Sequence, residues 1–100
     1  MLEPDYIRAH KHCFGNREEI VKSAMCGCFY CLAIFPPSDV THWIDESQTA
    51  MCPKCDIDSV IGSASGFPID VRFLKQMEGQ WFGTIKNQNS AKVDRALRHA

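Results

Sequence analysis

The chain has 100 residues, of which 45% are hydrophobic and 23% charged, and its formal net charge at pH 7 is −1. This length allows one domain with a modest core, and the composition is that of a globular protein rather than a disordered one. No stretch approaches the roughly 18 apolar residues of a membrane helix, and Met1–Tyr6 has neither the basic start nor the apolar run of a signal peptide. We therefore expect a cytoplasmic protein that meets no membrane and keeps its thiols reduced.

The N-terminal quarter is predicted to be partly helical. Residues 1–15 show no clear hydrophobic period, so we expect an irregular or partly helical arm there. Asn16 is a favourable helix cap, and the two carboxylates that follow it suit the positive end of a helix dipole. An apolar stripe between Ile20 and Ala24 then predicts a short helix over residues 17–25.

The central segment predicts two strands between two Cys-x-x-Cys pairs. Residues 32–35 are apolar and are followed by turn-forming residues 36–39, whereas residues 40–45 alternate in hydrophobicity as a half-buried strand does. A polar turn over 45–48 leads into the second cysteine pair. We expect an α+β fold with a two-stranded hairpin between two metal-binding knuckles, the core of a zinc ribbon or treble clef, flanked by helices.

The C-terminal half is predicted to contain a short strand within residues 56–62, a flexible loop over 62–66 and a helix. The loop lacks the Lys-Ser/Thr that follows a phosphate-binding loop, so a solvated connector is favoured. Asp70 is a candidate cap for a helix over 71–82, which Gly83 can end. One face of this helix is apolar and is expected to close the core. Its members are Phe73, Leu74, Met77 and Trp81.

Residues 1–83 are therefore expected to form one zinc-binding domain, and residues 84–100 a polar, basic tail. Asn87–Ser90 would serve as a hinge, and residues 91–99 as a weakly amphipathic helix. Either fraying or docking of this tail is compatible with its sequence.

Cys28, Cys31, Cys52 and Cys55 are the candidate metal ligands. A tight turn at each Cys-x-x-Cys pair directs both sulfurs toward one point, and two such pairs make a four-thiolate site. Four sulfurs about 2.3 Å from one Zn²⁺ complete a closed tetrahedron with no position for substrate. The spacing predicts one structural zinc.

Four other side chains could contribute to metal binding. His10, His12 and Cys13 lie close together in the sequence, and Cys26 offers a Cys-x-Cys pairing with Cys28. Because four cysteines with the usual spacing are already present, we favour Cys26 as a small buried thiol, with Gly27 helping the turn, and leave the other three outside the site.

Charge is distributed unevenly along the chain. Residues 28–70 carry six carboxylates and one base, Lys54, which gives −5, and four thiolates around one Zn²⁺ add about −2. Residues 84–100 carry four bases and one acid, which gives +3. An acidic zinc lobe would repel a phosphate backbone, so a protein partner, one that could present a basic surface, is favoured over nucleic acid.

More than half of the chain, from Cys26 to Trp81, resembles a small family of uncharacterised bacterial cytoplasmic proteins. The resemblance rests on the runs CGCFYC, WIDE, TAMCPKC, DIDSVIG, GFPID and FLKQM. It implies a fold and a compartment, but no activity and no catalytic residue.

A more distant resemblance is to the treble clef of HNH endonucleases, through the two knuckles and the runs FPPS and THW. It implies His42 as a general base, with Asp45 or Asp58 near a catalytic divalent ion. The chain departs from that pattern because Thr41 rather than Asp precedes His42, and because the Asn-containing loop and the Cys-Asn-x-x-Lys run are missing.

These observations favour a nonenzymatic, zinc-stabilised protein-interaction module with an acidic lobe and a basic tail as contact surfaces. The alternatives are a degenerate HNH-type nuclease that uses His42 and a nucleic-acid binder that works through the tail.

Overall fold

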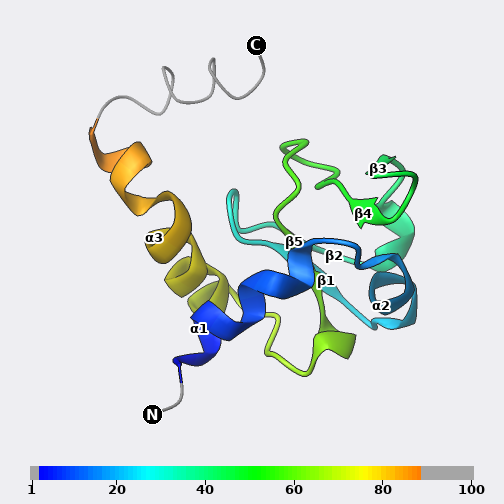
Figure 1. Ribbon diagram of the computed structural model, residues 1–100, viewed down its shortest axis with the longest axis horizontal. Helices are drawn as coiled ribbons and strands as arrows, with labels where there is room; N and C mark the ends of the chain where they lie inside the picture. The colour runs from blue at the N-terminus through cyan, green and yellow to red at the C-terminus, as the bar shows by residue number, and fades with distance from the viewer. Residues whose placement is uncertain (1–2, 89–100) are drawn as a thin grey trace.

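The computed structural model describes residues 3–88, which form a small α+β fold around a three-stranded antiparallel sheet (Figure 1). The strands β1 (Cys26–Cys28), β2 (Ile34–Phe35) and β5 (Val60–Gly62) lie in the order β2-β1-β5. Cys26 pairs with both Phe35 and Gly62, so the chain segment before the first knuckle is the central strand. The predicted mixed fold is confirmed at this level.

The N-terminal arm is partly helical, as predicted. It consists of α1 (Asp5–Arg8), which runs directly into the 3-10 helix η1 (Ala9–Cys13). Contacts join α1 to α3 and η1 to β5, so the arm lies across the sheet and the C-terminal helix (Figure 1). Ala9 is fully buried at this crossing.

Helix α2 (Arg17–Lys22) is shorter than the predicted helix over 17–25. Ser23 is already extended, and its hydroxyl donates to the Glu19 carbonyl at 2.8 Å while accepting from the Ala64 amide at 2.9 Å. A serine hydroxyl that bonds its own last turn competes with helix propagation. The helix therefore ends at Lys22, and the Ser23 hydroxyl links its end to the segment after residue 62.

Asn16 occupies the N-cap position of α2, as predicted, but its side chain faces inward and makes no capping hydrogen bond. Its amide Nδ2 donates to the carbonyls of His12 and Val60, both at 2.8 Å, and its Oδ1 accepts from the Ala50 amide at 3.1 Å. The residue is 4% exposed. One buried side chain thus joins the N-terminal arm, strand β5 and the segment at Ala50.

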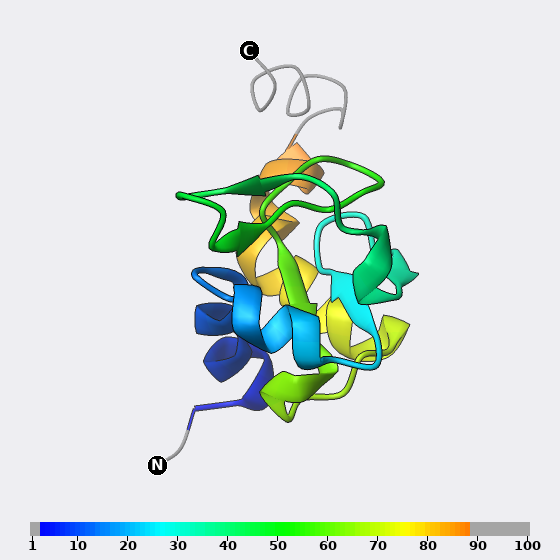
Figure 2. The same ribbon diagram turned by 90° about the vertical axis from the view of Figure 1, so that its right-hand side faces the viewer.

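A two-stranded hairpin lies between the two knuckles, as predicted, but the two predicted strands are shorter than expected and do not pair with each other. Residues 34–35 of the predicted strand over 32–35 form β2 and pair with β1. Of the predicted strand over 40–45, only β3 (Trp43–Ile44) is observed, and it pairs with β4 (Thr49–Ala50). The polar turn over 45–48 is confirmed as the tip of this β3–β4 hairpin, which lies at the end of the molecule away from the N-terminus (Figure 2).

The predicted flexible loop over 62–66 is instead a 3-10 turn, η3 (Ser63–Ser65), fastened to the end of α2. The Ser63 hydroxyl accepts from the amides of Ala24 and Met25, at 2.9 and 3.3 Å. Serine side chains that satisfy backbone amides give this segment a defined conformation.

Helix α3 (Val71–Gln88) begins as predicted and continues beyond Gly83, which does not end it. The Asp70 carboxylate caps it by accepting from the Phe73 amide at 2.8 Å. Phe73, Leu74 and Met77 are buried and Trp81 is partly buried, which confirms the apolar face. The proposed boundary at residue 83 falls within α3, and the predicted helix over 91–99 lies outside the described residues.

Two glycines permit close approach between elements. Gly27 lies in β1 rather than in a turn, and a Cβ there would meet Leu74 Cδ1 of α3 at 2.7 Å. At Gly62 a Cβ would overlap Ser23 Oγ and lie 3.2 Å from Ile20 Cδ1. Gly27 allows α3, and Gly62 allows α2, to pack against the backbone of the sheet.

Replacing Gly62 with Ala should lower the free energy of unfolding by about 2 kcal/mol, because the new methyl group displaces the Ser23 hydroxyl from its two hydrogen bonds. Gly79→Ala is the matched control. Nothing lies within 4 Å of a Cβ there, and Ala should raise the stability of α3 by about 1 kcal/mol. Urea titrations of the metal-loaded protein measure both changes, and equal midpoints for the two variants would contradict this account of Gly62.

Candidate metal centre

The four predicted cysteines converge on one point. Cys28 Sγ lies 3.6 Å from Cys55 Sγ, and Cys31 Sγ lies 3.7 Å from Cys52 Sγ. All four sulfurs lie within 4.8 Å of one another. In a tetrahedron with metal–sulfur bonds of about 2.3 Å the sulfurs are about 3.8 Å apart. The observed separations therefore fit a tetrahedral ion at the centre of the cluster.

The two knuckles have the same backbone geometry. In the first, the Cys28 amide donates to the Ala33 carbonyl at 2.9 Å, and the Leu32 amide donates to the Cys28 carbonyl at 2.8 Å. In the second, the Cys52 amide donates to the Ile57 carbonyl and the Asp56 amide to the Cys52 carbonyl, both at 2.9 Å. Each pair of bonds closes a tight turn that brings the two cysteines of a knuckle together.

Each knuckle also contains a non-glycine residue in the left-handed region. Leu32 has φ 67° and Asp56 has φ 61°, each directly after the second cysteine of its pair. Glycine is the usual residue at such positions, so the absence of glycine hid this feature from the sequence. Both residues allow the chain to turn sharply directly after the second cysteine of each pair.

Backbone amides point at the sulfurs. The amides of Tyr30 and Cys31 donate to Cys28 Sγ at 3.3 and 3.4 Å, and the Lys54 amide donates to Cys52 Sγ at 3.3 Å. Amide dipoles directed at sulfur stabilise the thiolate over the thiol. The first sulfur of each knuckle is thus prepared to carry negative charge before any cation is considered.

Proton sharing within the cluster makes the four thiols unequal. Hydrogen bonds from the Cys28 and Cys55 thiols lower the pKa of Cys52 to about 2. The pKa of Cys28, in contrast, is raised by the hydrogen bonds that Cys28 makes with Cys52 and Cys55. The thiols therefore ionise unequally when no cation shares the site. A divalent ion would replace the shared protons and allow all four groups to become thiolates.

The cluster is largely enclosed. Cys28 and Cys52 are buried, Cys55 is intermediate and Cys31 is exposed. Tyr30, between the first two cysteines, is buried in the same core as Cys28 and Cys52. The metal centre is thus part of the hydrophobic core, with one ligand at its surface.

Cys26 and Cys13 lie outside the cluster. Cys26 is fully buried in β1, as the prediction of a small buried thiol required. Cys13 is partly buried and packs against a second group of core residues. This group consists of Ala9, Phe29, Ile61, Phe73, Leu74 and Met77. Among residues 3–88, no other group of three or more His, Cys, Asp or Glu side chains converges.

The two N-terminal histidines have partners of their own. The His10 ring packs against the Trp81 ring with centroids 4.0 Å apart, and burial lowers the pKa of His10. His12 Nδ1 bonds the Glu19 carboxylate at 2.9 Å. The structure places neither with the four cysteines.

His42 lies near the second knuckle but not in the cluster. Its Nδ1 is 3.0 Å from Asp56 Oδ1, and both side chains are more than half exposed. In the described part of the chain it joins no group of three or more potential ligands with Asp45 or Asp58.

The fold and the site together define a small α+β chain with a four-cysteine cluster compatible with a zinc ribbon. No protein-family profile, curated protein or solved structure matches this chain. The two resemblances given above therefore stay hypotheses. None of the helices within residues 3–88 has the length and apolar character needed to cross a membrane.

Replacing Cys31 with Ser should abolish metal binding and unfold the chain. The free energy of binding a structural zinc, about 10–16 kcal/mol, is comparable to the whole stability of a small domain. Cys26→Ser and Cys13→Ser are the controls and should keep one ion per chain. Native mass spectrometry and far-UV circular dichroism of all three variants provide the test, and loss of metal from either control would overturn the ligand assignment.

Cys13 should resist alkylation in the folded protein. Burial, with a smaller contribution from the negative charge of Asp58, raises its pKa from 9.0 to about 11. Because the thiolate is the reactive species, iodoacetamide at pH 8 should modify folded Cys13 roughly 100-fold more slowly than urea-unfolded Cys13. The folded state also retains this proton more tightly, so the contribution of Cys13 to stability is constant below pH 9 and declines between pH 9 and about 11.

Peptide mass spectrometry of timed alkylation reactions measures the rate at this one residue. In Asp58→Asn the rate should rise only a few-fold, because burial remains the larger cause of the raised pKa. Equal rates for the folded and the unfolded chain would contradict the prediction.

Proposed function

We propose that Cys28, Cys31, Cys52 and Cys55 hold one structural Zn²⁺ and that the chain is a nonenzymatic protein-interaction module of a reducing cytoplasm. Thiolate ligands in tetrahedral arrangement favour Zn²⁺ among the common divalent ions. The sulfur separations of 3.6 and 3.7 Å support this choice. Four protein ligands leave no open position on the metal, so the ion's role is structural.

The excess of exposed carboxylates in residues 28–70 supports an interaction role. Every carboxylate residue between 28 and 70 is exposed. They are Asp39, Asp45, Glu46, Asp56, Asp58 and Asp70. With Lys54 as the only base in this stretch, the lobe would attract a basic partner and repel a phosphate backbone. The basic sequence of residues 84–100 would provide the second contact surface.

The observation that carries this proposal is a four-cysteine cluster, two members of which are buried in the core, within a segment whose six carboxylates are all exposed. A second candidate function is that of a degenerate HNH-type nuclease, and its only structural support is the exposed His42–Asp56 pair. That pair could accept a proton from a nucleophile, but Asp56 is its only acidic partner among the described residues. Metal-dependent cleavage that is lost in His42→Ala would favour the nuclease.

Neutralising the hairpin tip should weaken partner binding. The full chain and its Asp45→Asn/Glu46→Gln variant are used as bait in cytoplasmic extract, in parallel with and without added nuclease. Recovery of a protein partner should fall several-fold in the variant and should not depend on nuclease. Asn tolerates the left-handed conformation of residue 45, so the tip keeps its shape.

Glu3→Gln/Asp5→Asn is the control, since it removes two exposed carboxylates from the N-terminal arm, at the end of the molecule away from the hairpin (Figure 2). Unchanged recovery in the tip variant would remove the main support for the acidic contact surface. Recovery of only nuclease-sensitive material would instead favour nucleic-acid binding through residues 84–100.

A further inference from the structure

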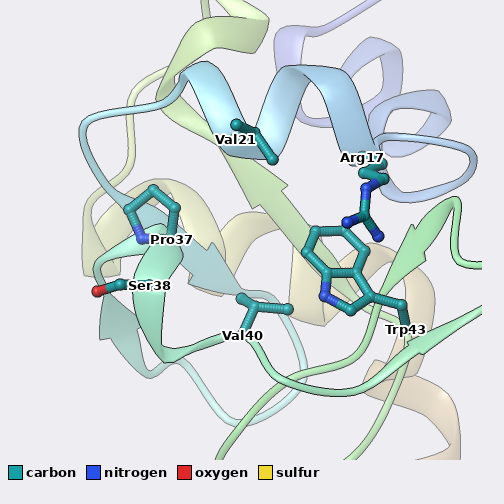
Figure 3. Close-up of a pocket in the computed structure, with 6 residues that line it drawn as sticks. All are labelled: Arg17, Val21, Pro37, Ser38, Val40 and Trp43. Carbon is teal, nitrogen blue, oxygen red and sulfur yellow. The ribbon is translucent and has the colours of Figure 1, made fainter.

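An apolar groove lies between α2 and the chain that links β2 to β3 (Figure 3). Its volume is about 520 Å³. Six residues line it: Arg17, Val21, Pro37, Ser38, Val40 and Trp43. Neither the metal centre nor the His42–Asp56 pair contributes to the lining, so the groove is a separate feature of the surface.

The groove is held in shape by contacts to the core. Val40 is 7% exposed, and Trp43 packs against the same core cluster as Cys28 and Cys52. The Arg17 guanidinium lies over the Trp43 ring, 4.7 Å from its centroid. These contacts fix the floor and one wall before any ligand arrives, which lowers the entropic cost of binding.

One wall of the groove is apolar and open to solvent. Val21 is 62% exposed and, with Pro37, faces across the groove toward Trp43 (Figure 3). The rest of α2 on the outside is charged, with Glu18 and Lys22 paired at 3.2 Å. With Pro37 and Trp43, Val21 forms an apolar patch rimmed by polar residues, which is typical of a contact site.

Three exposed carboxylates lie next to the groove residues in the sequence. Asp39 continues the turn η2 (Pro37–Asp39), which supplies one wall, and Asp45 and Glu46 follow Trp43 in the hairpin. Within residues 3–88 these three exposed carboxylates form no ion pair. The two nearby bases are already engaged, Arg17 with Trp43 and Lys22 with Glu18.

The hairpin tip beside the groove is strained. Asp45, Glu46 and Ser47 have φ values of 54°, 58° and 69°, three consecutive non-glycine residues in the left-handed region. Arg17 holds this tip in place, since its Nη1 donates to the Ser47 carbonyl and its amide to the Gln48 carbonyl, both at 2.9 Å. Strain of this kind concentrates at functional sites, and here it presents two carboxylates at the groove.

The groove has room for no more than about one turn of a helix. One turn of a helix with side chains, about 11 Å across and 5.4 Å high, has a volume of roughly 500 Å³, so the groove would accommodate a single turn. An extended segment of a few residues fits better, and segments rich in proline bind grooves lined by aromatic residues. Lysine or arginine beside the apolar residues of such a segment would meet the carboxylates of Asp39, Asp45 and Glu46.

We propose that this groove binds an extended segment of a partner protein, in which proline or leucine is flanked by lysine or arginine. The proposal rests on the proposed function as an interaction module and identifies the surface and the chemistry of its partner. The apolar side chain lies between Val21, Pro37 and Trp43, and the flanking bases face Asp39, Asp45 and Glu46.

A phage-displayed library of random dodecapeptides, selected against the full metal-loaded chain, tests this proposal. The selected peptides should combine proline or leucine with lysine or arginine. A synthetic copy of the dominant peptide, measured by fluorescence anisotropy, should bind at least tenfold more weakly to Val21→Glu. Val71→Glu is the matched control, because Val71 is 52% exposed at the start of α3, away from the groove, and should leave affinity unchanged.

Raising salt from 50 to 300 mM, or introducing Asp45→Asn/Glu46→Gln, should also weaken binding several-fold if bases meet these carboxylates. Peptides with acidic flanks, affinity that is unchanged in Val21→Glu, or failure to select any peptide would overturn the groove proposal. If the partner recovered from extract still binds Val21→Glu at full strength, the groove proposal fails and the interaction-module proposal stands. If extract yields no protein partner, the module proposal itself fails.

Discussion

The fold depends on the convergence of four sulfurs from two knuckles that are separated by 20 residues in the chain. Without a cation these groups share protons unequally, which lowers the pKa of Cys52 and raises that of Cys28. A divalent ion removes that conflict, and the gain in free energy is then available to folding. The strands around the site have only two or three residues each, too few to be stable alone. A metal ion held by the four cysteines would therefore supply stability that these short strands cannot.

The hydrogen bonds of two buried side chains, Asn16 and Ser23, form a second constraint on the fold. Asn16 bonds the carbonyls of His12 and Val60 and the amide of Ala50, and Ser23 bonds Glu19 and Ala64. Buried polar side chains of this kind are favourable only when every partner is present, because an orphaned carbonyl or amide costs about 1–3 kcal/mol. They fix α2 against both the sheet and the β3–β4 hairpin. The groove lies between α2 and the chain that leads into this hairpin, so the same bonds help to fix its shape.

The sequence indicates the metal ligands, the cap at Asp70 and the apolar face of α3, because each is a local pattern of spacing. The pairing of β1 with β5 joins residues 26–28 to residues 60–62, and no local sequence pattern indicates it. Residues 40–45 alternate as a strand does, but only Trp43 and Ile44 find a partner. Asn16 has the chemistry of a cap, yet burial redirects its amide inward. Left-handed Leu32 and Asp56 were hidden because sequence analysis expects glycine at such positions.

The metal that stabilises the fold would also set the charge of its surface. Four thiolates around Zn²⁺ have a net charge of about −2, and the β3–β4 hairpin that leads into the second knuckle presents Asp45 and Glu46 at its tip. Near this hairpin the surface combines exposed carboxylates with the apolar wall at Val21 and Pro37. Because Arg17 contacts both Trp43 and the carbonyls of the tip, groove and carboxylates are one rigid unit. A partner that matches only the charge or only the apolar wall would lose half of the available contacts, which is how such a surface achieves specificity.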